Sequence, residues 1–99
     1  MLRLVLLALI LLPLPAGAVK LQGHVGDRLA ECLEHRIMTQ SIPDLVQPFR
    51  DRQEVRMWRS EFWGKWFTSA VLAYRYAPTP ELKKRVDEAV AELVRTQSA

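Results

Sequence analysis

The sequence contains a single cysteine, Cys32, among 99 residues. One thiol cannot form an internal disulfide, so this chain must fold without the cross-links that stabilise most small secreted domains. The length allows one small domain and is short for most enzymes. The excess of basic residues is also small, with 14 Lys and Arg against 11 Asp and Glu. An excess of this size does not indicate a nucleic-acid-binding surface, and we expect no nucleic-acid partner.

Long apolar runs are absent except at the N-terminus. Residues 4–12 read LVLLALILL after the cationic Arg3, and the stretch PLPAGA at 13–18 ends in small residues. This pattern predicts a signal peptide over residues 1–18, with cleavage before Val19. Nine helical residues rise only about 14 Å, half of the roughly 30 Å of hydrocarbon, so an uncleaved anchor is the weaker alternative. We expect a secreted or periplasmic product that has no membrane contact after cleavage.

Residues 19–99 show helical periodicity and no strand pattern, which predicts an all-α fold with three main helices and a short one. The expected helices cover residues 27–38, 43–49, 60–76 and 80–96. The first carries one apolar stripe, formed by Val25, Leu29, Cys32, Leu33 and Ile37. The last carries another, formed by Leu82, Val86, Ala89, Val90, Leu93 and Val94. Both stripes are expected to face the core.

Proline and arginine mark the expected breaks between these helices. Pro48 is predicted to interrupt the short second helix, because a proline removes a backbone donor and crowds the preceding turn. Residues 50–59 hold four arginines without a clean period and are predicted to form an irregular connection.

The third predicted helix is apolar on nearly all sides and begins with an aromatic cluster. Trp63, Trp66 and Phe67 recur at helical spacing and are predicted to be core residues. Trp58 and Glu61 lie at the N-terminal end of the helix, where we expect an open cleft. An indole face can pack on a sugar ring and a carboxylate can accept hydrogen bonds from hydroxyls. Trp58 and Glu61 are therefore the candidate substrate-binding residues.

Gly64 lies inside the same predicted helix, where it costs about 1 kcal/mol relative to alanine. Its presence predicts that another group approaches the backbone closely at that point. A helix that is apolar on both sides also needs neighbours on both sides. If the chain itself does not supply them, self-association through this exposed apolar helix is expected.

A metal site is not indicated by the sequence. Cys32, His35 and His24 are close in sequence, but they form no pair with the usual spacing of zinc ligands. Cys32 is predicted to be a small hydrophobic residue of the first stripe, and the two histidines to be surface or capping groups.

Five segments resemble, in the same order, the N-terminal part of the β-L-arabinofuranosidase-type glycoside hydrolases of family 127. The segments are Leu21–Leu29, Asp44–Arg50, Trp58–Trp66, Ala73–Tyr76 and Thr96–Gln97. The most specific element is the run EFWGKW at positions 61–66. The resemblance covers essentially all of residues 19–99 and implies the first part of an (α/α)6 barrel, left incomplete.

The resemblance also implies what this chain does not contain. Full-length members carry a zinc-bound cysteine nucleophile, further cysteine ligands and an acidic partner later in the barrel. Cys32 does not match that nucleophile, so we expect no catalytic residue and no cofactor in this chain. Glycoside cleavage needs two groups across the bond, and Glu61 is the only carboxylate in the aromatic cluster.

Three interpretations follow. In the first, the chain is a partial N-terminal segment of a secreted glycoside hydrolase that acts on plant-type glycans, and it is inactive alone. The completed enzyme would bind an arabinose-containing glycan. The alternative is a stand-alone secreted helical module that binds carbohydrate or protein. The third is a helical protein in which these motifs serve only packing.

Overall fold

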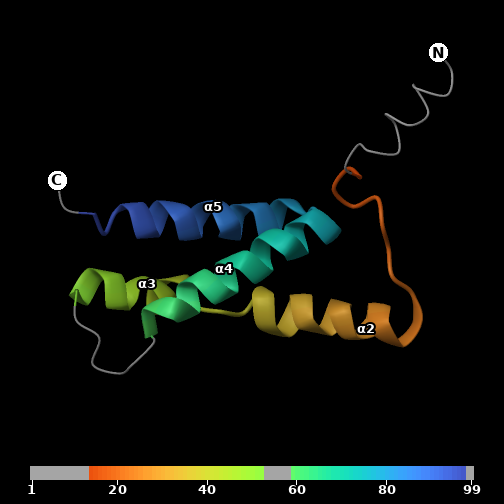
Figure 1. Ribbon diagram of the computed structural model, residues 1–99, viewed down its shortest axis with the longest axis horizontal. Helices are drawn as coiled ribbons and strands as arrows, with labels where there is room; N and C mark the ends of the chain where they lie inside the picture. Colours follow the sequence, from red (N-terminus) through yellow and green to blue (C-terminus); the bar gives the residue numbers. More distant parts are fainter. Residues whose placement is uncertain (1–13, 53–58, 98–99) are drawn as a thin grey trace, which may run out of the picture.

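The computed structural model describes residues 14–52 and 59–97, and all regular structure within these ranges is helical. The elements are α2 (Gly23–Cys32), the π-helical turn η1 (Leu33–Ile37), α3 (Ile42–Asp51), α4 (Arg59–Tyr76) and α5 (Pro80–Val94) (Figure 1). The predicted all-α class is confirmed. The likeness to the first part of an (α/α)6 barrel stays a prediction.

Helix α3 differs from its prediction because Pro48 does not interrupt it. Ser41 caps the helix by accepting a hydrogen bond from the backbone N–H of Asp44 at 3.3 Å. The helix continues through Pro48, whose ring is buried, and ends only when Arg52 adopts a left-handed conformation with φ 53°. Proline removes one internal hydrogen bond, and here burial of its ring offsets that loss.

The predicted connection 50–59 is shortened from both sides. Arg50 and Asp51 belong to α3, and Arg59 is the first residue of α4. Residues 53–58 lie outside the described ranges. At the C-terminal end, α5 stops at Val94, two residues before the predicted end.

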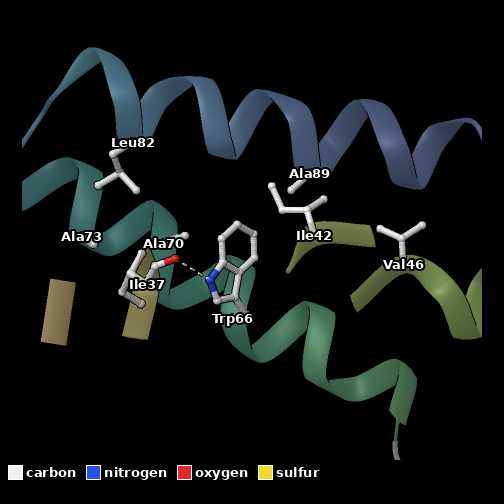
Figure 2. Packing of buried hydrophobic residues seen from close by; sticks show 8 residues of the cluster. All are labelled: Ile37, Ile42, Val46, Trp66, Ala70, Ala73, Leu82 and Ala89. Atoms are coloured by element: carbon white, nitrogen blue, oxygen red, sulfur yellow. Dashed lines mark hydrogen bonds between the residues drawn. The ribbon is translucent and has the colours of Figure 1, made fainter. Parts of the chain in front are cut away.

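The core forms where α3, α4 and α5 pack against one another and η1 packs against α4. Its buried residues are Ile37, Ile42, Val46, Trp66, Ala70, Ala73, Leu82 and Ala89 (Figure 2). Trp66 lies in the middle of this cluster, and its Nε1–H donates to the backbone oxygen of Ile37 at 3.1 Å. Trp63 and Phe67 stack with ring centroids 4.6 Å apart and lie half-buried at the edge of the core. The prediction that the three aromatic residues pack against the core is therefore confirmed, with only Trp66 fully inside.

Helix α2 buries none of its residues, and among the described helical elements it contacts only η1, which continues it. In Figure 1 it extends from the three-helix core, and α4 approaches only its continuation. The predicted core stripe is thus covered only in part: Ile37 is buried, and Leu29 and Leu33 are half-buried. For Val25, which is 62% exposed, and for Cys32, which is exposed, the prediction of burial is wrong. Periodicity identifies an apolar face, but it does not supply the helix that covers it.

The stripe of α5 is covered only in part. Leu82 and Ala89 are buried, whereas Val90 and Val94 are exposed. These two valines follow the helical period but lie at the margin of the face that meets α3 and α4.

Residues 14–21 run along the C-terminal end of α4. The Gly17 N–H donates to the backbone oxygen of Arg75 at 2.7 Å, and Lys20 Nζ donates to that of Tyr76 at 2.9 Å. Most of the predicted signal peptide, residues 1–13, lies outside the described ranges. Within those ranges no helix has the length and apolarity to cross a membrane.

The close approach predicted at Gly64 is not found. A Cβ built at this position meets no described atom within 4 Å. We therefore expect Gly64→Ala to raise the free energy of unfolding by about 1 kcal/mol, because alanine restricts the unfolded chain more than glycine does. Urea unfolding followed by circular dichroism measures the change.

Gly26 is the matched control for this substitution. A Cβ at Gly26 in α2 would overlap the backbone carbonyl of Leu21, so Gly26→Ala should lower stability or displace residues 19–22. If Gly64→Ala were the destabilising variant, a surface outside the described ranges would have to contact that glycine.

Candidate functional site

The two predicted substrate-binding residues have different outcomes. Trp58 lies outside the described residues. Glu61 lies in the first turn of α4 with its side chain 48% exposed, and its Oε1 is 3.8 Å from Lys65 Nζ. Glu61 is thus accessible at the N-terminal end of α4, beside a single cation one turn further along.

The surface next to Glu61 contains a groove of about 420 Å³ between α4 and the segment formed by η1 and the start of α3. Its lining residues are Cys32, Arg36, Ile37, Gln40, Leu45, Phe62, Lys65, Trp66 and Ser69. A smaller depression of about 250 Å³ adjoins it. The depression is lined by Gln40, Ser41, Asp44, Leu45, Arg59 and Phe62. Because the two share Gln40, Leu45 and Phe62, we treat them as one surface and call it the Phe62 groove.

One face of α4 builds one wall of the Phe62 groove. Phe62, Lys65 and Ser69 are spaced three and four residues apart, so they stand above one another along the helix. Phe62 is 52% exposed. The Ser69 hydroxyl donates to the backbone oxygen of Lys65 at 3.0 Å, which leaves the ammonium of Lys65 as the main polar group of this wall.

The opposite wall depends on the π-helical turn. The N–H of Met38 donates to the oxygen of Leu33, five residues earlier, at 3.0 Å. A turn closed in this way holds more residues than an α-helical turn and changes the direction of the side chains that follow it. As a result Ile37 enters the core while Arg36 stays on the groove surface.

Cations outnumber carboxylates along the Phe62 groove. In the part of the chain that the structure describes, Arg36, Lys65 and Arg59 line it, and Asp44 is the only carboxylate of the lining. Among the described residues neither arginine forms an ion pair, and Lys65 is matched only by Glu61. In the described part of the chain a change in pKa occurs elsewhere, on α5, where the Lys83 ammonium donates a hydrogen bond to Asp87 at 2.6 Å and this contact raises the pKa of Lys83.

No group of three or more His, Cys, Asp and Glu side chains that could hold a metal ion occurs in the described part of the chain. The two histidines are exposed, as predicted, and Cys32 is exposed at the rim of the Phe62 groove.

The sequence analysis pointed to the N-terminal end of α4 but not to the Phe62 groove. Glu61 does not itself line it, whereas its neighbours Phe62 and Lys65 do. Arg36 and Leu45 come from elements that meet α4 only through tertiary packing, and no local pattern in the sequence indicates that meeting.

The chain has no significant match to any known family model, any curated protein or any solved structure. The resemblance to glycoside hydrolase family 127 therefore rests on the five sequence segments.

Proposed function

We propose that this chain is the N-terminal portion of a secreted or periplasmic glycoside hydrolase that resembles the β-L-arabinofuranosidases of family 127, and that it is inactive alone. The proposal is supported by the ordered sequence segments, above all by EFWGKW at positions 61–66, which opens α4.

The observation that carries the proposal is the amount of apolar helix surface left uncovered in the described ranges. Helix α2 has no buried residue, and Leu72 of α4 is 59% exposed. Helices of this kind need further helices beside them, as the first helices of a larger helical domain do.

Two features support the proposal that the isolated chain has no glycoside hydrolase activity. The nucleophile of the resembled family is a zinc-bound cysteine held with further cysteine ligands, and this chain contains one cysteine in total. Glu61 is exposed beside Lys65 and is the only carboxylate of residues 58–67, whereas glycoside cleavage needs two groups across the bond. In the completed enzyme, Trp58 and Glu61 would contact an arabinose-containing glycan, and later segments would supply the zinc.

Sequencing the coding DNA beyond Ala99 tests this proposal. We expect a continued or interrupted reading frame that encodes Asp-Gly-Tyr and then a cysteine-rich segment. The 99-residue chain should release no arabinose from arabinofuranosides, and mixing it with the polypeptide encoded downstream should restore release. A stop codon followed by no such remnant would contradict the proposal.

The alternative is a stand-alone helical module that binds carbohydrate or protein. The Phe62 groove favours it, because this surface is formed within the described residues and needs no further domain. A true stop codon after Ala99, together with a stable folded chain that binds a ligand, would favour this alternative.

A further inference from the structure

We propose that the Phe62 groove binds an acidic amphipathic peptide segment of a partner protein. The proposal concerns a binding surface of this chain and does not depend on glycoside hydrolysis.

The floor of the groove is suited to an apolar side chain. Ile37 and Trp66 form its deepest part and are each 7% exposed, and Leu45 is half-buried beside them. Phe62 forms an exposed apolar wall above this floor. A leucine or phenylalanine of a partner that entered here would remove apolar surface of both chains from water.

The rim of the groove selects the charge of the partner. Arg36 and Lys65 stand on opposite walls, and Arg59 extends the same positive rim along the adjoining depression. Since the two arginines have no carboxylate partner among the described residues, carboxylates of a bound segment can pair with them. Such complementarity favours acidic segments over basic ones.

The same lining is poorly suited to a sugar ring. Trp66 is too buried to offer its face, and its N–H is already donated to Ile37. The hydroxyl of Ser69 is engaged by the backbone of α4. Among the described residues of the lining, Phe62 is then the one exposed aromatic side chain, next to aliphatic side chains. This combination matches the grooves that receive the apolar face of a helical peptide.

Cys32 allows the proposal to be tested without introducing a label. It is the only cysteine of the chain, it is exposed, and it lines the groove. An occupant of the groove should therefore slow alkylation of its thiol. The probe is a synthetic twelve-residue peptide with leucines at helical spacing and glutamates elsewhere, and the matched control peptide carries lysines in place of the glutamates.

At saturation the acidic peptide is expected to slow alkylation of Cys32 in the full chain by fivefold or more, while the lysine peptide has no effect. Protection should weaken as salt is raised above 0.1 M, where the Debye length falls below about 10 Å. The double variant Arg36→Glu/Lys65→Glu should lose protection by the acidic peptide and gain protection by the lysine peptide. Lys84→Glu, which changes an exposed lysine of α5 outside the groove, should leave protection unchanged.

Equal protection by the two peptides would overturn the proposal, because the rim would then not select charge. Protection by an arabino-oligosaccharide and not by the acidic peptide would also overturn it, and would assign the groove to glycan binding instead. Circular dichroism of each variant establishes that it is folded. If the charge-reversal variant were unfolded, Arg36→Gln/Lys65→Gln would replace it. The acidic peptide is then expected to lose its protection of Cys32. Unchanged protection in this variant would contradict the proposal. Arabinose release by the completed enzyme is a separate measurement, so the two proposals can fail independently.

Discussion

Trp66→Ala is expected to lower the free energy of unfolding by about 3 to 5 kcal/mol. The indole ring lies at the centre of the core and is 7% exposed, so its removal leaves a cavity lined by residues of η1, α3 and α5. The substitution also leaves the backbone oxygen of Ile37 without its donor. Because a chain of this size is stable by only about 5 to 10 kcal/mol, we expect a largely unfolded or loosely packed variant. Urea unfolding followed by circular dichroism measures the loss.

Two further variants separate the causes of this effect. Trp66→Phe keeps much of the ring but loses the N–H donor, so it should cost less than the alanine variant and still about 1 to 3 kcal/mol. Trp63→Ala removes a half-buried ring that stacks on Phe67, and its indole N–H has no hydrogen-bond partner among the described residues. It should therefore cost less than Trp66→Ala. A loss below 1 kcal/mol for Trp66→Ala would show that this tryptophan does not organise the core.

The helices could be predicted from the sequence where local signals determine them. Thr79 and Pro80 mark the start of α5, and the Thr79 hydroxyl accepts a hydrogen bond from the N–H of Leu82 at 3.2 Å. Ser41 marks the start of α3 in the same way. The end of α3 was missed because the rule that proline breaks helices is local. Burial of Pro48 is a tertiary effect that this rule does not include.

The first apolar stripe was predicted to face the core along its whole length, because Val25 to Ile37 read as one helix place their apolar residues on a single face. Val25 and Cys32 stay exposed because, within the described residues, α3, α4 and α5 do not pack against α2. The π-helical turn η1, which carries Ile37 into the core and Arg36 to the Phe62 groove, has no signal in the apolar periodicity of the sequence.

The sequence can place candidate residues only along one helix. Glu61 lies exposed in the first turn of α4, and its contact with a glycan stays a prediction. The opposite wall of the groove comes from η1 and α3, and the sequence gives no local sign of where these elements meet α4.

The role of Glu61 can be tested in a chimaera in which residues 19–99 replace the corresponding portion of an active full-length member of family 127. Glu61→Gln is expected to lower kcat/KM for an arabinofuranoside by about 10- to 150-fold, which corresponds to a charge-assisted hydrogen bond of about 1.5 to 3 kcal/mol. Stability should hardly change, because Glu61 is exposed and its pair with Lys65 is of the i,i+4 type, worth about 0.3 to 0.5 kcal/mol.

Glu81→Gln is the matched control, because Glu81 is also an exposed carboxylate in the first turn of a helix. Both carboxylates interact favourably with the positive end of their helix, so neutralising either removes a similar contribution to stability. Only Glu61 follows the aromatic position Trp58 and opens the EFWGKW run, and so only its substitution should affect turnover. Equal activity of the two variants would show that Glu61 serves α4 as a first-turn carboxylate and does not contact the glycan.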